Sequence, residues 1–265
     1  MSIEQWKTHI TRAKNIFVVT GAGISIASGI PPFRKDKDAV WERDVMLYAT
    51  RYYLQQHPVN FWIWYHRTFA SVQCAKPNVA HDSLVAIEQW AALHGKQMQL
   101  CTQNIDGLHR VAGTQNLIEI HGRTDVFRCS NDDCINGAPY GLISAKEVDF
   151  SGFLRTSSVQ TIPKCALCSA PIRPHVLLFD ENYDSHLDYN WESFCRALGE
   201  AHLVLCIGTS FSVGVTEQIY RFARQTRIPM LGLDPSPTEK YPYVQWCTEK
   251  AEVFVPQLRD AVITE

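Results

Sequence analysis

The chain has 265 residues, 46% of them hydrophobic and 20% charged, which is the composition of a globular protein with a large core. Its 25 basic and 27 acidic residues leave a formal net charge of -2, so composition gives no basic surplus that would attract nucleic acid or an anionic membrane. No apolar run has the length of a membrane span, and residues 1–15 lack the apolar region of a signal peptide, so we expect a cytoplasmic location.

Short apolar runs alternate with helical patterns along most of the chain. Residues 1–15 predict a short amphipathic helix. Strands are expected at 16–20, 98–102, 117–120, 176–179, 203–207 and 229–233, and helices at 81–95, 215–226 and 255–263. Runs that are apolar throughout are typical of strands buried on both faces of a parallel sheet. Their alternation with helices therefore predicts an α/β fold with a doubly wound sheet.

Two stretches interrupt this alternation. Residues 35–75 are rich in aromatic side chains around the run FWIWYHRTF, and we expect a helical insert whose aromatic side chains pack in a core. Residues 123–175 show little regular pattern and contain four closely paired cysteines. We interpret this second stretch as a small zinc-binding module and assign residues 1–34, 76–122 and 176–265 to the main domain.

The four cysteines have the spacing of metal ligands. Cys165 and Cys168 form a CxxC pair, and Cys129 and Cys134 are separated by four residues. Such spacings allow two thiolates of each pair to reach one tetrahedral zinc, and a site filled by four protein ligands is structural because no position is left for substrate. His175 is a spare candidate ligand. A redox-active CxxC pair is the alternative interpretation.

A glycine turn follows the first predicted strand. Gly21, Ala22 and Gly23 could bring backbone N–H groups close to a ligand phosphate, because glycine places no side chain in the way. The common dinucleotide fingerprint would place a third glycine at position 26, where this chain has Ile26. The turn therefore differs from that of a common dehydrogenase.

Polar residues also follow three later strands. Gln103, Asn104 and Asp106 come directly after the strand at 98–102, and their side chains suit a ribose or a carboxamide, although an Asx turn would use the same residues. His121 follows the strand at 117–120 and is a candidate general base, although a lone histidine is more often structural. The run Gly208-Thr209-Ser210 follows the strand at 203–207 and could supply a second phosphate or ribose contact.

Several motifs occur together and in one order: GAGIS at 21–25, SGIPPFR at 28–34, TQNIDGLH at 102–109, EIHG at 119–122, the two cysteine pairs, RPHVLLFDE at 173–181, GTS at 208–210 and AEVFVPQL at 251–258. With this combination the chain resembles the sirtuin family of NAD-dependent protein deacylases over nearly its whole length. The resemblance implies a Rossmann-like domain with a small module that holds a structural zinc and a helical insert. It also implies NAD as a co-substrate.

The resemblance assigns roles to individual residues. It implies that NAD contacts Gly21, Ala22, Gly23, Ser25, Phe33, Arg34, Gln103, Asn104, Ile105, Asp106, Gly208, Thr209, Ser210, Asp234 and Ala251. Phe33 and Arg34 would lie on a loop that covers the cofactor. His121 would be the general base on the ribose hydroxyls, and Asn104 would share the catalytic site with it.

The implied reaction transfers the acyl group of an acyl-lysine in a protein or peptide to NAD, with release of nicotinamide, O-acyl-ADP-ribose and free lysine. The peptide would lie extended beside residues 176–181, and the substrate-binding residues would be Tyr65, Val176, Phe179 and Glu181. ADP-ribosyl transfer or NAD hydrolysis in the same pocket is an alternative, and a non-catalytic NAD-sensing module is another.

Four departures from the family pattern bear on the substrate. Pro32 stands where the family often has aspartate, Asp180 replaces a glycine, and the pair Cys129/Cys134 is wider than a CxxC. Relatives that remove succinyl groups have a tyrosine and, three residues later, an arginine. Here Tyr65 is followed by Arg67, one position early, and this shift rotates the side chain by about 100° around a helix. We therefore expect succinyl-lysine to be a poor substrate.

Overall fold

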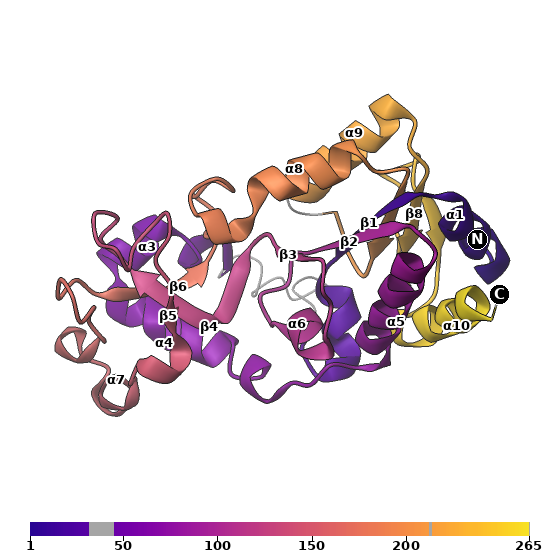
Figure 1. Cartoon of the computed structure of the whole chain (residues 1–265). Helices are drawn as coiled ribbons and strands as arrows, with labels where there is room; N and C mark the ends of the chain where they lie inside the picture. The colour runs from indigo at the N-terminus through magenta and orange to yellow at the C-terminus, as the bar shows by residue number, and fades with distance from the viewer. Residues whose placement is uncertain (32–44, 212–213, 265) are drawn as a thin grey trace.

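The computed structural model describes residues 1–31, 45–211 and 214–264 (Figure 1). Its larger part is built on a six-stranded sheet in the order β3-β2-β1-β7-β8-β9. All neighbouring strands of this sheet run parallel, as the sequence predicts. The strands are β1 (Asn15–Thr20), β2 (Gln97–Thr102), β3 (Leu117–Glu119), β7 (Leu203–Ile207), β8 (Met230–Leu233) and β9 (Gln245–Cys247).

Helices cover both faces of this sheet, which gives three layers (Figure 1). One face packs against α1 (Ile3–Arg12), α5 (Val79–Leu93) and α10 (Ala251–Ile263), through a core that contains Trp6, Ile87 and Phe254. The other face packs against α8 (Trp191–Gly199) and α9 (Gly214–Thr226), through a core that contains Phe194 and Ile219. The fold class predicted from the sequence is confirmed.

Local sequence explains where these helices begin. Ser2 accepts a hydrogen bond from the N–H of Gln5, and the side chain of Gln5 accepts one from the N–H of Ser2, so α1 starts with a capping box. Asn78 caps α5 in the same way, with its side-chain oxygen 2.9 Å from the N–H of Ala80. The predicted helix at 81–95 therefore begins two residues earlier, at Val79.

A smaller part of the molecule holds a three-stranded sheet in the order β5-β4-β6. Its strands are antiparallel, and they are β4 (Gly122–Cys129), β5 (Ile143–Ser144) and β6 (Ile172–Val176). Three helices lie around it: α3 (Arg51–Gln56), α4 (Pro58–Thr68) and α7 (Ser151–Thr156), whereas α6 (Leu108–Ala112) lies beside α5 of the larger part. Trp62 of α4 lies 4.6 Å from Phe150 between ring centroids and contacts Phe127 of β4. The helical insert and the cysteine-rich module thus share one core.

The structure corrects one predicted strand. Residues 176–179 were expected to belong to the parallel sheet, but β6 ends at Val176 and pairs with β4 in the small sheet. Leu178 instead packs into the core of the small part, which accounts for the apolar run. The strands β4 and β9 and the helix α8 were not predicted. Among the described residues, no helix combines the length and apolar character needed to cross a membrane.

Candidate functional site

The predicted cofactor residues meet at one edge of the parallel sheet. From the central strand β1 the chain moves outward to β2 and β3, and later from β7 to β8 and β9 in the opposite direction. The carboxyl ends of β1 and β7 therefore form a topological switch point, where open α/β sheets bind their ligands. The residues that follow these strand ends are Gly21–Ser25 after β1, Gln103–Asp106 after β2, His121 after β3, Gly208–Ser210 after β7 and Asp234 after β8.

The structure gives a different reason for the glycines of this turn from the one expected. Residues 22–28 form a 3-10 helix, η1 (Ala22–Ser28), which lies against the turn after β7. The N–H of Gly21 donates to Ile207 O, and the N–H of Gly23 donates to Gly208 O at 2.8 Å. A Cβ on Gly23 would lie 2.6 Å from Gly208 Cα. These two glycines are therefore required by the close approach of two backbones, and their N–H groups already have protein acceptors.

Three polar side chains beside this turn form a hydrogen-bonded group. Ser25 donates to Asp106 Oδ2 at 2.7 Å, and Asn104 Nδ2 donates to Ser25 Oγ and to Gly21 O, both at 3.1 Å. Asp106 Oδ1 also accepts the N–H of Leu108, which fixes the start of α6. Burial raises the pKa of Asp106, and the hydrogen bonds from Leu108 and Ser25 oppose that rise. Two of the three residues predicted from the TQNIDGLH segment, Asn104 and Asp106, are thus assembled with Ser25.

His121 is held in one tautomer by the neighbouring strand end. Its Nδ1 lies 2.8 Å from the carbonyl oxygen of Gln103. Because a carbonyl oxygen can only accept, Nδ1 carries the proton and Nε2 is left as a proton acceptor. The ring stacks on Tyr183 with 5.9 Å between centroids. Burial lowers the pKa of His121 to about 4, so the ring is neutral at pH 7.

The remaining predicted cofactor residues take different positions. Thr209 is buried, and its Oγ1 accepts a hydrogen bond from Gln103 Nε2 at 3.0 Å, so Gln103 connects the ends of β2 and β7. Asp234 is buried after β8 and accepts the N–H of Ser236, and Ala251 is the buried first residue of α10. Ser210 is exposed. Phe33 and Arg34, like Pro32, lie outside the described residues.

The predicted substrate residues do not form one group. Tyr65 is buried among Phe61, Trp62 and Phe69 in the core of the small part, and burial raises the pKa of its hydroxyl. Val176 is half-buried at the end of β6, and Phe179 is 47% exposed.

Glu181 has a partner within the protein. Its Oε2 lies 2.8 Å from Arg173 Nη2 and accepts the N–H of Leu178. Hydrogen bonds and attraction from Arg173 hold the pKa of Glu181 below its ordinary value, although burial acts in the opposite direction. Its carboxylate therefore braces the segment 176–181.

This segment is also not an open strand edge. The N–H of Leu177 donates to His121 O, and the N–H of Phe179 donates to Ala49 O, both at 2.9 Å. A peptide that pairs with this segment would have to use other backbone groups or displace one of these bonds.

The four cysteines form a metal site. Their sulfur atoms all lie within 4.8 Å of one another, with 3.4 Å between Cys129 and Cys168 and 3.8 Å between Cys134 and Cys165. Four sulfurs around a tetrahedral zinc are about 3.8 Å apart, since each Zn–S bond is about 2.3 Å. Burial raises the pKa of Cys129, and a bound cation would stabilise its thiolate at neutral pH. The cluster fits a structural zinc.

His175 is not a ligand of this site. Its side chain is buried, with Nε2 3.0 Å from Asp188 Oδ2 and the ring stacked on Tyr189. The four thiolates already complete a tetrahedral site, so a fifth ligand is not required.

Several residues that support the site were not identified from the sequence. Asn78 donates to Ile24 O and to Ser28 Oγ, and thereby anchors η1 to α5. Thr20 contacts His109 Nε2 and donates to Thr102 Oγ1, both at 2.9 Å. An asparagine just before an apolar helical pattern is an N-cap signal that could have identified Asn78. The buried threonine pair has no such signal.

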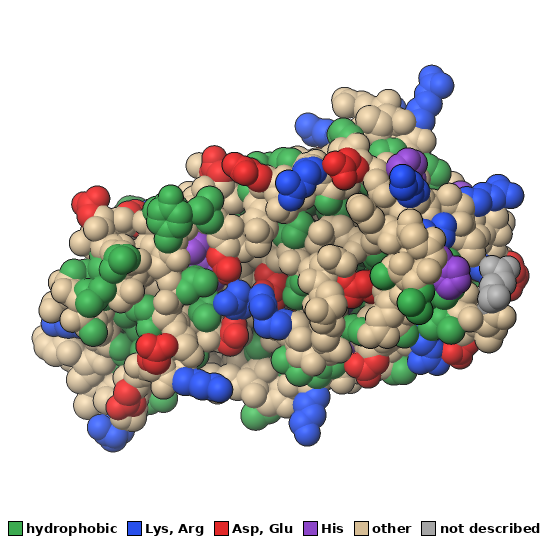
Figure 2. Space-filling view, in the orientation of Figure 1, with side chains coloured by type: hydrophobic (Ala, Val, Ile, Leu, Met, Phe, Trp, Pro, Cys, Tyr) green, Lys and Arg blue, Asp and Glu red, His purple; other side chains and the backbone are tan. Residues whose placement is uncertain are grey.

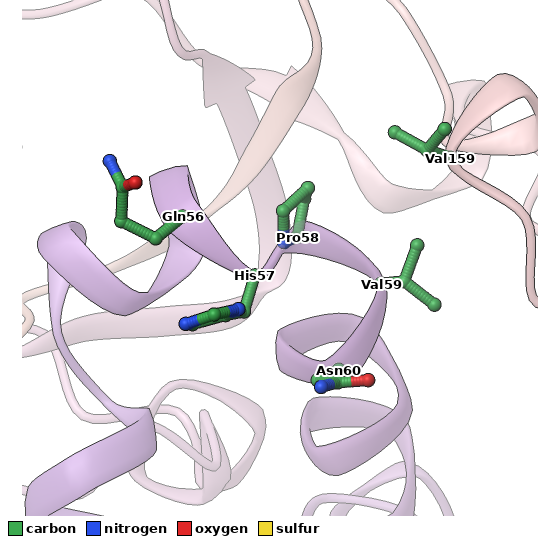
Figure 3. Close-up of a pocket in the computed structure, with 6 residues that line it drawn as sticks. All are labelled: Gln56, His57, Pro58, Val59, Asn60 and Val159. Carbon is green, nitrogen blue, oxygen red and sulfur yellow. The ribbon is translucent and has the colours of Figure 1, made fainter.

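A surface pocket lies away from these strand ends, at the junction of α3 and α4. Figure 3 shows its lining residues, which are Gln56, His57, Pro58, Val59, Asn60 and Val159. None of them is a predicted site residue. On the face drawn in Figure 2, Lys and Arg side chains lie among Asp and Glu side chains, and no basic patch like that of a nucleic-acid-binding protein stands out.

Comparisons with known proteins agree with this arrangement. The sequence profile of the Sir2 family matches residues 21–215. The chain is 34% identical to the NAD-dependent deacetylase sir2E of Dictyostelium discoideum over 265 residues, which covers 95% of this chain and 75% of that protein. It is 33% identical to an NAD-dependent protein deacylase of Thermus thermophilus over 241 residues, with 91% of this chain and 87% of that protein covered.

The fold is also similar to that of solved structures. A solved structure of a Sir2 homologue in complex with NAD has a TM-score of 0.81 and 27% identity, and the match covers 98% of this chain and 94% of that chain. The profile match and these curated relatives extend over most of the sequence, including the glycine turn, the TQNIDGLH segment and His121. The chain therefore belongs to the Sir2 family.

Proposed function

We propose that this chain is an NAD-dependent protein-lysine deacylase that acts on acetyl-lysine. The observation that carries the proposal is the position of a neutral histidine, His121, at the same sheet edge as Ser25, Asn104 and Asp106. The curated relatives named above are NAD-dependent deacetylases and deacylases, and this supports the same class of enzyme here.

The residues at the switch point suit a nicotinamide nucleotide. Amide and carboxylate groups of Asn104 and Asp106 can hydrogen-bond a ribose or a carboxamide, and Thr209 and Asp234 lie at the adjacent strand ends. When bound, NAD supplies a glycosidic bond from which nicotinamide can leave. Hydrogen bonds with Ser25 and Gln103 hold Asn104, Asp106 and Thr209 in place, and such preorganisation favours the reactive geometry.

His121 acts as the general base in this proposal. Its Nε2 can accept a proton from a ribose hydroxyl, while Nδ1–H remains bonded to Gln103 O. The acyl oxygen would take the place of nicotinamide at C1′ of the ribose. The deprotonated hydroxyl would then attack the carbonyl carbon of the acyl group, and one water would be consumed as the amine of lysine leaves, so that the acyl group remains on the ribose. The products would be nicotinamide, O-acyl-ADP-ribose and free lysine.

Deacylation assays on His121 variants test this role. The protein is incubated with an acetyl-lysine peptide, with and without NAD, and the loss of the acetyl group is followed by mass. We expect deacylation only with NAD, and a fall of about 100-fold or more in His121→Ala. The matched control is His202→Gln, because His202 is exposed at the opposite edge of the sheet, before β7. Deacylation that persists in His121→Ala would contradict the proposal.

The acyl preference is a separate prediction. Tyr65 is buried, whereas Arg67 is exposed, so the two side chains lie on different faces of α4. Without a cation beside Tyr65, the carboxylate of succinyl-lysine would be buried without a partner. We expect kcat/KM for a succinyl peptide to be about tenfold or more below that for the acetyl peptide. Thr68→Arg, which places a cation three residues from Tyr65, should narrow this difference. Equal kcat/KM values in the unmodified protein would show the prediction to be wrong.

A further inference from the structure

We propose that Asp180, Arg51 and Asp132 form a clasp that positions the substrate segment 176–181 against α3 and the zinc loop. This inference rests on the proposed deacylase function, because it assigns a role in peptide binding to residues outside the cofactor site. The three residues come from three segments: Asp180 from the loop after β6, Arg51 from the start of α3, and Asp132 from the loop between Cys129 and Cys134.

Asp180 forms the first contacts of the clasp, with the backbone of α3. Its Oδ1 accepts the N–H of Arg51 at 2.6 Å, and its Oδ2 accepts the N–H of Tyr52 at 3.0 Å. The N–H of Tyr53 is bonded to Thr50 Oγ1. The first turn of α3 thus obtains two of its acceptors from a distant segment of the chain, and a carboxylate is favourable at a helix N-terminus. The negative charge of Asp180 is directed at these amides.

Arg51 forms the second contact of the clasp, with Asp132. Its Nη2 lies 2.7 Å from Asp132 Oδ2. Asp132 stands in the four-residue loop between two zinc ligands, and that loop is tied to the cluster because the N–H of Asn131 donates to Cys129 Sγ. The two departures from the family pattern noted in this region, the wide cysteine spacing and Asp180, therefore meet at a single arginine.

The clasp acts on a segment that contacts the catalytic histidine. The N–H of Leu177 donates to His121 O, and the N–H of Phe179 donates to Ala49 O. Glu181 braces the same segment from within through Arg173. Asp180 is the only side chain of residues 176–181 with a hydrogen bond to α3 among those observed in the described structure. Its removal takes away both side-chain bonds to α3 and leaves the bond from Phe179 to Ala49 and the inner brace in place.

Kinetics with peptide and NAD varied separately test the clasp. In Asp180→Gly we expect KM for the acetyl peptide to rise about fivefold, because the loss of one helix cap costs a free energy that corresponds to about this factor. The values of kcat and of KM for NAD should stay within about twofold of those of the unmodified protein. Asp180→Asn keeps one side-chain oxygen as a cap acceptor and should restore most of the peptide KM. Asp184→Gly is the matched control, because Asp184 is an exposed acidic residue four positions further along the chain.

Two kinetic outcomes overturn the inference. One is a peptide KM in Asp180→Gly that does not differ from that of Asp184→Gly. The other is an equal change in kcat, in KM for NAD and in KM for peptide, because a general loss of structure would move all three together.

Amide hydrogen exchange separates this inference from the proposed function. In Asp180→Gly the amides of Arg51 and Tyr52 lose their acceptors, so peptides that span residues 45–57 should exchange faster than in Asp184→Gly. This result supports the clasp even if the unmodified protein shows no deacylation, in which case the proposed function fails. Equal exchange in the two variants overturns the clasp whatever the activity.

Discussion

At the scale of single residues, the surroundings of His121 determine its chemistry. Burial lowers its pKa to about 4, and the hydrogen bond to Gln103 O only partly opposes this. A lowered histidine pKa keeps the neutral, proton-accepting form down to lower pH. We therefore predict that kcat/KM does not fall between pH 7 and pH 5.5 through protonation of this residue, and that an acid limb appears nearer pH 4.

The pH dependence of kcat/KM for the acetyl peptide checks this prediction. The free enzyme's essential base determines the acid limb of that profile. An acid limb with an apparent pKa near 6.5, the value of an exposed histidine, would show that burial does not control His121.

Gly23 is the second residue whose role depends on its surroundings. A side chain there would press on the backbone of Gly208, which cannot rotate away as a flexible side chain can. We expect Gly23→Ala to destabilise the protein by about 1–3 kcal/mol, the usual range for overpacking a well-packed site. Gly199→Ala is the control, since a Cβ at Gly199, the last residue of α8, meets nothing within 4 Å. Urea unfolding measures the stability of both variants. Equal unfolding midpoints for Gly23→Ala and Gly199→Ala would contradict the explanation that Gly23 is required by the close approach of Gly208.

At the scale of elements, the zinc module depends on its metal. The small sheet has only β4, β5 and β6, and the cysteine cluster joins the end of β4 to the knuckle at 165–168. We predict that Cys165→Ser loses its zinc and becomes insoluble or partly unfolded, because metal binding is coupled to folding at such sites. Cys195→Ser, at an exposed cysteine of α8, should keep one zinc per chain. Metal analysis measures the zinc content of each variant, and circular dichroism measures its folding. A soluble, active, zinc-free Cys165→Ser protein would contradict the prediction.

Most strands of the parallel sheet could be predicted because each is a short run of mainly apolar residues. The strands β7 and β8 are apolar throughout and β1 and β2 have apolar centres, and each was predicted within one residue of its bounds. The strand β6 was missed because it contains Arg173 and His175, whose polar groups are paired with Glu181 and Asp188. Those partners lie eight and thirteen residues further along the chain, and no local pattern indicates that they pair.

The positions of the site residues follow from the order of the strands, whereas their contacts do not. Ser25, Asn104 and His121 could be predicted to lie together, because the carboxyl ends of parallel strands meet at one edge of a sheet. The hydrogen bonds that join Ser25 to Asn104 and Asp106 could not, since they depend on distances between segments about eighty residues apart. For the same reason the brace by Glu181 could not be distinguished from a contact with substrate.

At the scale of the whole molecule, buried histidines make stability depend on pH. His81, His121 and His186 have pKa values of about 4, in each case because of burial, against about 6.5 in an unfolded chain. Between these values the unfolded chain binds more protons, so the free energy of unfolding falls as pH decreases from about 6.5 to 4. Each histidine contributes at most about 1.4 kcal/mol per pH unit. The raised pKa values of Asp106 and Glu119 act in the opposite direction.

Urea unfolding at several pH values between 7 and 5 tests this. The unfolding free energy should decrease with falling pH, and His81→Gln should reduce the slope, whereas His202→Gln should not. A stability that is constant over this range would contradict the assignment of neutral buried histidines.

The central claim is that the acyl group of a lysine is transferred to the ribose of NAD. The most direct measurement is the mass and the amount of every product after the protein has acted on NAD and an acetyl-lysine peptide. We predict equal amounts of nicotinamide, O-acetyl-ADP-ribose and deacetylated peptide. Nicotinamide accompanied by free or protein-bound ADP-ribose, with the acetyl group still on the peptide, would contradict the claim and indicate NAD hydrolysis or ADP-ribosyl transfer.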